Sequence, residues 1–168
     1  MTPGSDAGNV ALFSQEAAVE AQPARYAEIV VNAEQGAAWK AITDFDAMAA
    51  RSPETVKMFI SSKPKVGTRA FNINRRKGFF WPTTATITRW DEGKGFAFHV
   101  WPPNVEWSYD LEAVDGGTKI IERRTALVDP NLAVRITARW ALGGSDSHDK
   151  EIQEGMHKTL EAIKSELD

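Results

Sequence analysis

Hydrophobic and polar residues alternate through the middle of the chain, as in β-strands that bury one face. Side chains of a strand point alternately to its two faces, so residues two apart share a face. Phe96 and Phe98 therefore share one face of a strand, and Trp107 and Tyr109 share one face of another. Six strands are predicted after residue 54. They cover residues 56–60, 67–75, 79–88, 95–101, 106–113 and 118–124.

Short turn sequences separate the predicted strands. Lys77-Gly78 and Asp115-Gly116-Gly117 are typical examples, because glycine accepts backbone conformations that other residues avoid. Parallel pairing would need long crossover segments between strands. The pattern therefore predicts an antiparallel meander.

Segments of helical period flank these strands. A first strand is expected over residues 26–31, followed by a helix with Asn32 as N-cap and Gln35 completing a capping box. A second short helix surrounds Met48, and another is predicted from Asp129 to Leu142. The final helix starts near residue 145 and carries an apolar stripe. Its members are Ile152, Met156, Leu160, Ile163 and Leu167. Strands followed by helices indicate an α+β fold.

Composition and charge argue against several classes of function, but they do not identify one. The 168 residues suit one domain, which we place at residues 24–168 after a tail at 1–23. A net charge of −3 gives no support to a nucleic-acid partner, and the absence of cysteine excludes disulfides and thiol chemistry. No stretch has the length and apolarity of a transmembrane helix, and the N-terminus lacks a secretory signal pattern. We expect a cytoplasmic protein, either a monomer or a homodimer.

The order of these segments resembles the START-like (SRPBCC) superfamily, in particular its bacterial polyketide cyclase/dehydrase-like and lipid-transport-like members. The resemblance covers residues 25–167. It rests on residues 29–33 and 38–44, Ser52-Pro53-Glu54, Val66-Gly67-Thr68, residues 107–111, Gly117-Thr118 and residues 155–160. It implies a helix-grip fold, in which a curved antiparallel sheet wraps around the C-terminal helix and leaves an internal cavity. Such proteins include ligand carriers and cyclases, so the fold alone does not select a function.

Large aromatic residues are the candidate walls of this cavity. A row of rings on one sheet face can form a solid core or line a pocket for an apolar ligand, and the resemblance favours the pocket. Gly155 in the last helix could leave room for a ligand, allow close contact with the sheet, or be an exposed glycine. The predicted ligand-binding residues are Trp81, Phe96, Phe98, Trp107, Tyr109, Glu122, Met156 and Leu160.

Glu122 is the candidate polar group, but its orientation depends on strand phase. It shares a face with Ile120 and Arg124, so a cavity-facing phase would give a buried acid with a raised pKa. Charged residues are mostly solvated, which favours the opposite phase. For Asn72 and Asn74 the same ambiguity holds, and satisfied hydrogen-bond donors are expected there more often than ligand contacts.

The remaining polar features carry less chemistry. Arg75-Arg76-Lys77 could attract an acidic headgroup, although three charges at a hairpin tip favour a solvated turn. The three histidines lack metal-ligand spacing, and neither a metal site nor a cofactor is predicted.

Three functions remain in consideration. The main hypothesis is binding of a hydrophobic or aromatic small molecule, lipid- or polyketide-like, in the cavity. The first alternative is a cyclase/dehydratase-type enzyme that uses Glu122 or Tyr109 as acid or base. The second is a non-catalytic interaction protein whose contact surface surrounds Trp90, Trp101 and Trp140.

Overall fold

The computed structural model describes residues 25–127 and 145–168. The elements follow the predicted order of one strand, two helices, six strands and a final helix. They are β1 (Arg25–Val31), α1 (Gln35–Thr43), α2 (Phe45–Arg51), β2 (Thr55–Ile60), β3 (Arg69–Arg76), β4 (Phe79–Asp91), β5 (Gly95–Trp101), β6 (Val105–Val114), β7 (Gly117–Ala126) and α4 (Ser145–Leu167). The helix predicted from Asp129 to Leu142 and the predicted tail at 1–23 lie outside the described residues. No helix in the described ranges combines the length and apolarity needed to cross a bilayer.

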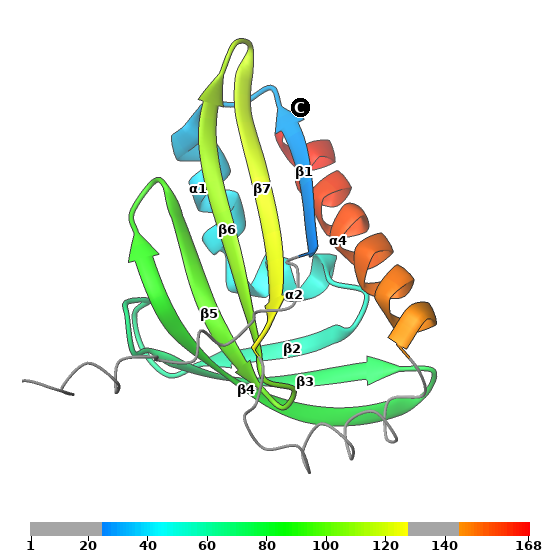
Figure 1. Cartoon of the computed structure of the whole chain (residues 1–168). Helices are drawn as coiled ribbons and strands as arrows, with labels where there is room; N and C mark the ends of the chain where they lie inside the picture. Colours follow the sequence, from blue (N-terminus) through cyan, green and yellow to red (C-terminus); the bar gives the residue numbers. More distant parts are fainter. Residues whose placement is uncertain (1–24, 128–144) are drawn as a thin grey trace, which may run out of the picture.

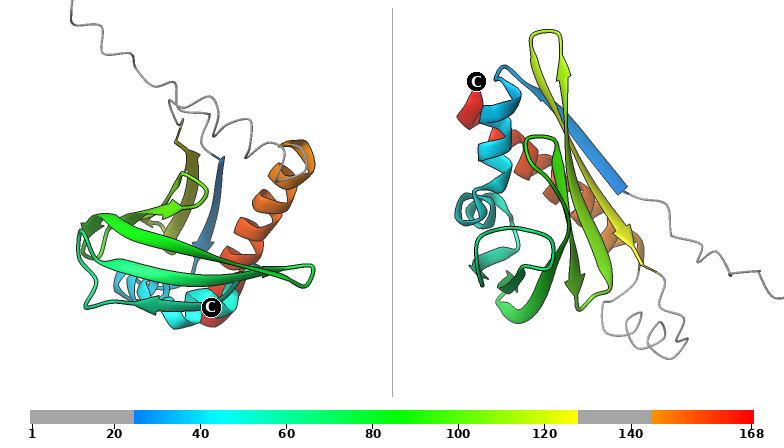
Figure 2. Two further views of the ribbon diagram at one scale, coloured as in Figure 1. Left: turned by 90° about the horizontal axis from the view of Figure 1, so that it is seen from below. Right: turned by 90° about the vertical axis from the view of Figure 1, so that its left-hand side faces the viewer.

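All seven strands form one antiparallel sheet in the order β1-β7-β6-β5-β4-β3-β2. Strand β1 pairs with β7, and β2 to β7 pair in sequence order as the predicted meander. The sheet bends strongly, so that β2 and β3 run across the direction of β6 and β7 (Figure 1). Helix α4 lies alongside β1, and the two short helices lie on the inner side of the curve (Figures 1 and 2). This confirms the α+β helix-grip architecture.

The start of α1 differs from the predicted capping box. Glu34 is the N-cap, and no side chain caps this end. The Asn32 backbone N–H donates to Asp168 Oδ1 at 2.8 Å, and Gln35 Nε2 donates to the Gly93 carbonyl at 2.7 Å. The capping-box prediction is wrong, because long-range partners from α4 and the β4–β5 turn engage both residues. A local cap forms instead at α2, where Asp44 Oδ1 accepts from the Ala47 N–H at 3.0 Å.

The main core lies where β1, β5, β6 and β7 face the helices. Its centre is Phe96, whose ring stacks on Tyr109 with centroids 5.4 Å apart. Trp90 packs into this core, with its ring centroid 5.0 Å from that of Trp39. The contact surface predicted around Trp90 is therefore wrong for this residue, since a register shift between Ile87 and Arg89 changes the phase of alternation in β4 and turns the Trp90 ring inward. Its largest fully buried members are Val31, Ile42, Phe96, Ile120, Met156, Leu160 and Ile163.

Candidate functional site

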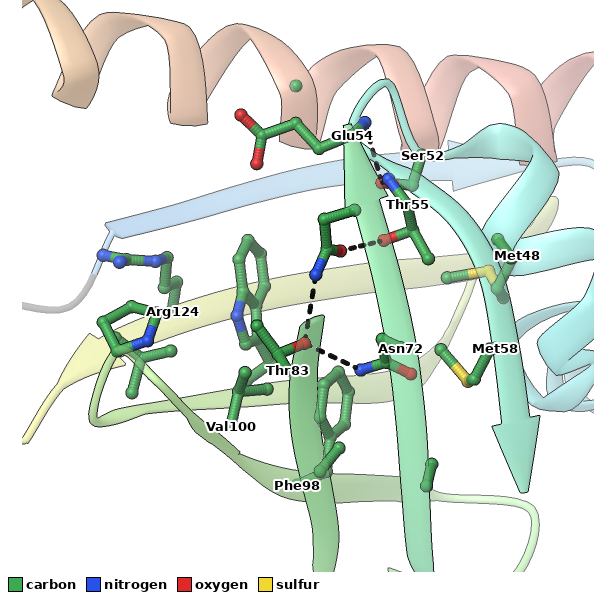
Figure 3. A pocket seen from close by; sticks show the side chains of 18 of the residues that line it. Met48, Ser52, Glu54, Thr55, Met58, Asn72, Thr83, Phe98, Val100 and Arg124 are labelled. Carbon is green, nitrogen blue, oxygen red and sulfur yellow. Dashed lines mark hydrogen bonds between the residues drawn. The ribbon is translucent and has the colours of Figure 1, made fainter. Parts of the chain in front are cut away.

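A cavity of about 1060 Å³ lies between the concave face of the sheet and the helices. Strand alternation supplies its floor: Ala70, Asn72 and Asn74 face inward from β3, and their neighbours Thr83 and Ala85 do so from β4. Further walls come from α2, β2, β5, β6, β7 and α4. Figure 3 shows some of these side chains, including Met48 of α2, Met58 of β2 and Phe98 of β5. The volume is in the upper range of small-molecule pockets.

Most residues predicted to bind a ligand line this cavity. The aromatic face of β5 and β6 turns toward it, as two-residue alternation requires. Leu160 is the exception, since it lies one turn further along α4 and is buried in the packed core. The predicted residues that line the cavity are Trp81, Phe96, Phe98, Trp107, Tyr109, Glu122 and Met156.

Glu122 points inward and is only 3% exposed, so the interpretation that placed it in water is wrong. It lies opposite Tyr109 in the β6–β7 register, and the Tyr109 hydroxyl donates to Glu122 Oε1 at 2.6 Å. The other face carries Arg123, which pairs with Asp110 at 2.7 Å. The pairing of Glu122 with Tyr109 would have predicted its orientation, because directly opposite residues of neighbouring strands point to the same face of the sheet.

Burial changes the acid–base properties of this pair. It raises the pKa of Glu122 to about 7, and the hydrogen bond from Tyr109 opposes that rise. For Tyr109, burial raises the pKa well above its usual value, and the negative charge of Glu122 adds to the effect. Glu122 therefore exists in both protonation states near neutral pH, which suits an acid or a base.

A second polar group occupies the floor of the cavity. Asn74 Nδ2 donates to Thr83 Oγ1 at 3.1 Å, and Thr55 Oγ1 donates to Asn74 Oδ1 at 3.3 Å. Asn72 Nδ2 approaches the same Thr83 oxygen at 3.4 Å (Figure 3). The side-chain N–H donors of both asparagines are therefore hydrogen-bonded, as expected, and both residues also line the cavity. Two buried acceptors, Asn72 Oδ1 and Glu122 Oε2, have no hydrogen-bond partner among the described residues.

Exposed lining residues mark where the cavity reaches the surface. Most of them lie in or beside the β3–β4 turn, the β5–β6 turn and the first half of α4. Arg76 lines the cavity and forms an ion pair with Glu151 of α4, so the turn is fastened to the helix. The prediction of a solvated basic turn is therefore wrong for Arg76, while Arg75 and Lys77 are exposed as predicted. The residues at this mouth include Lys77, Phe79, Trp101, Pro102, Pro103 and Glu151.

Gly155 lies at the cavity wall where α4 approaches the link between α2 and β2. A Cβ atom built on Gly155 would lie 3.3 Å from Pro53 Cγ. The glycine therefore permits a close contact, but the neighbour is Pro53 and not the sheet.

Neither His99 nor His157 lines this cavity. His99 faces the outer side of β5, and its Nε2 lies 2.6 Å from Asn104 Oδ1. Within the described residues, no group of three or more His, Cys, Asp or Glu side chains is placed to hold a metal ion.

Several solved structures share this fold at low sequence identity. The di-domain ARO/CYC StfQ from the steffimycin biosynthetic pathway superimposes with a TM-score of 0.68 at 12% identity, over 84% of this chain and 49% of that one. This chain thus spans about half of StfQ. Ara h 8.0201 gives 0.65 at 16% identity, over 86% and 97% of the two chains. The Polyketide_cyc-like protein Cgl2372 from Corynebacterium glutamicum gives 0.55 at 21% identity, over 84% and 88%.

Two sequence comparisons gave different results. No curated protein has significant sequence similarity to this chain. A family model described as polyketide cyclase / dehydrase and lipid transport matches residues 23–167, a range that includes every described helix and strand. The match covers well over half of the sequence, and the chain therefore belongs to the polyketide cyclase/dehydrase and lipid transport family.

Proposed function

We propose that this protein binds an apolar or aromatic small molecule, lipid- or polyketide-like, in the cavity between sheet and helices. The supporting observation is a cavity of about 1060 Å³ with mostly apolar walls. Transfer of apolar ligand surface into such a site contributes about 25 cal/mol per Å² buried. Rings of Trp81, Phe98 and Trp107 supply much of this contact surface.

The polar groups of the cavity define the ligand further. Glu122 Oε2 and Asn72 Oδ1 are buried acceptors without partners in the described structure. Each unsatisfied buried group costs about 1–3 kcal/mol, and a donor on the ligand removes that cost. The expected ligand is therefore an apolar scaffold that carries hydroxyl groups.

Native mass spectrometry of the gently purified protein tests the proposal first. A mass excess that disappears on denaturation would reveal a bound small molecule and its class. The apo protein is then titrated with 2-naphthol and with naphthalene, and tryptophan fluorescence is followed. We expect 2-naphthol to bind more tightly, because it brings a donor to the buried acceptors.

Two variants make this test specific. Trp107→Ala should weaken binding, whereas Tyr26→Ala, which removes an exposed ring outside the cavity, should leave it unchanged. Absence of any adduct and of binding to both probes and a lipid panel would contradict the proposal.

The Glu122–Tyr109 pair supports an enzymatic alternative of the cyclase/dehydratase type. A buried carboxyl group with a pKa of about 7 can exchange protons with a substrate near neutral pH. The enclosing cavity would hold a reactive chain in a folded conformation. Glu122→Gln should abolish turnover of a polyketide-type substrate and retain its binding. A carrier, in contrast, would lose little in Glu122→Gln.

Of the tryptophans in the interaction-protein hypothesis, Trp90 packs against the core, Trp101 is 47% exposed at the cavity mouth, and Trp140 lies outside the described residues. The cytoplasmic location and the monomeric or dimeric state stay predictions.

A further inference from the structure

The outer face of the β2–β3–β4 part of the sheet differs from the rest of the surface. Alternation turns Asn72, Asn74 and their neighbours into the cavity, so the residues between them point outward. Three of these are phenylalanines: Phe59 is 52% exposed, Phe71 is 45% exposed and Phe80 is 54% exposed. Phe59 lies directly opposite Phe71 in the β2–β3 register. Large apolar side chains grouped in this way on a surface indicate a contact site.

Basic residues surround these rings. Lys57, Arg69 and Arg75 are exposed on the same outer face, and the Arg75 guanidinium lies 5.9 Å from the Phe80 ring centre. Between residues 55 and 90 the sequence holds eight Lys and Arg and no Asp or Glu, although the whole chain has a net charge of −3. These eight are Lys57, Lys63, Lys65, Arg69, Arg75, Arg76, Lys77 and Arg89.

The outer face of β6 and β7 provides the contrast. Its basic residues are matched by acids, since Arg123 pairs with Asp110 and Lys119 with Glu112. Arg89, at the far end of β4, also pairs with Asp110 at 2.6 Å. On β2, β3 and their turns, Lys57 lies 3.5 Å from Asp46 and Arg76 pairs with Glu151. Within the described residues, positive charge without an ion pair is concentrated there on Lys63, Lys65, Arg69, Arg75 and Lys77, in the part of the sheet that carries the exposed phenylalanines.

We propose that this aromatic–basic face, formed by Lys57, Phe59, Arg69, Phe71, Arg75 and Phe80, docks on an anionic lipid bilayer. Rings enter the interface between headgroups and acyl chains, while lysine and arginine pair with lipid phosphates. The β3–β4 hairpin that carries Phe80 also carries Phe79 at the cavity mouth, with Phe79 70% exposed. Docking therefore brings the opening of an apolar cavity close to the membrane.

Charge argues against two other occupants. A second copy joined by a two-fold axis would place this basic face against itself, which is unfavourable. A nucleic acid would have to approach a molecule whose remaining surface is strongly acidic, and it offers no apolar layer for the phenylalanine rings.

Cosedimentation of the full chain with vesicles tests the proposal. We expect binding to vesicles of phosphatidylcholine mixed with phosphatidylglycerol, and much weaker binding to phosphatidylcholine alone. Because one basic residue near the surface contributes about a fivefold change in partitioning, Arg69→Glu should weaken binding at least about fivefold. The matched control Lys158→Glu reverses an exposed charge on α4 and should stay within about twofold of wild type.

The rings are tested separately with Phe59→Ser and Phe71→Ser, and Tyr26→Ser on β1 is the matched control. Thermal unfolding checks that each variant is folded. A salt titration of the unchanged protein needs no variant, and rising salt should release it from anionic vesicles.

Lack of binding to anionic vesicles, equal binding to neutral ones, or full binding by the Arg69 and phenylalanine variants would overturn the proposal. A nucleic-acid site would be indicated instead if poly(U) at equimolar phosphate bound the protein directly and released it from the vesicles. A dimer interface would be indicated if the protein did not bind vesicles and formed a dimer that Phe71→Ser dissociates. None of these results depends on a cavity ligand, so the proposed function stands or fails independently.

Discussion

The two ends of the sheet are built from the same alternating pattern but reach opposite results. Where β1, β6 and β7 meet α4, the inward residues are Ile120, Leu111 and Ala27, and they pack against Met156, Leu160 and Ile163. Where β3 and β4 turn away from the helix, the inward residues are Ala70, Asn72, Thr83 and Ala85. The distance between sheet and helix matters more than side-chain size, since the small Ala27 lies in the core and the large Trp81 lines the cavity.

The outer surfaces of the two ends also differ. Over β6 and β7 the charges are paired across strands, as in Arg123–Asp110, which keeps that face electrically balanced. Over β2 and β3 the basic residues stand beside exposed phenylalanines. The end of the sheet formed by β2, β3 and β4, here called the hollow end, therefore has the features of a binding site on its inner face and of a contact site on its outer face. The end formed by β1, β6 and β7, here called the packed end, supplies stability.

The largest effect should follow from breaking the packed end. Leu160→Ala removes a side chain that is 1% exposed and should lower the free energy of unfolding by about 2–5 kcal/mol. Met58→Ala, at the cavity wall, should cost about 1 kcal/mol or less, because Met58 already borders open space. Urea unfolding of both variants measures the difference. Equal losses would contradict the distinction between core and cavity.

The buried carboxyl group of Glu122 should make stability depend on pH. Its pKa is about 7 in the folded state and close to 4.5 in the unfolded chain, so the folded state binds more protons between these values. The free energy of unfolding should then fall by about 3 kcal/mol as the pH rises from 4 to 8. Chemical unfolding across this range measures the slope.

Glu122→Gln provides the control for this pH dependence. Glutamine keeps the shape and cannot ionise, so the slope in this window should flatten and the variant should be the more stable protein at pH 8. An unchanged slope would mean that Glu122 is not its source.

Enlarging an alanine at each end should sharpen the comparison. Ala27→Leu overpacks the core and should cost about 1–3 kcal/mol. Ala85→Leu projects into the cavity and should cost less, while it weakens binding of 2-naphthol by reducing the space for it. Thermal unfolding and fluorescence titration test the pair. Greater destabilisation by Ala85→Leu would show that the cavity collapses in solution.

The smallest effect is expected at Gly155, where the two ends meet along α4. Alanine should add up to about 1 kcal/mol through its higher helix propensity, since Pro53 is exposed and can move by the few tenths of an ångström that its 3.3 Å approach requires. Chemical unfolding measures the sign. Destabilisation would show that Pro53 is held in place by the α2–β2 link.

Local periodicity was sufficient for the elements themselves. Alternation located the six later strands, and the i, i+3, i+4 stripe located α4 with Met156 and Leu160 on its buried face. The cavity-facing aromatic residues followed from the same alternation. The family resemblance, carried by the order of these segments, supplied the helix-grip arrangement.

The sequence by itself determined the α+β meander, its turns and the apolar face of α4, because these depend on neighbours within a few residues. Tertiary structure decided the rest. It set the inward phase of Glu122 through its register with Tyr109 and packed the half-buried Trp90 against the core. It also gave Asn32 and Gln35 hydrogen-bond partners away from the α1 cap. It also decided where the sheet bends away from α4 and leaves a cavity. Register and curvature bring together residues far apart in the chain, and no local pattern encodes those distances.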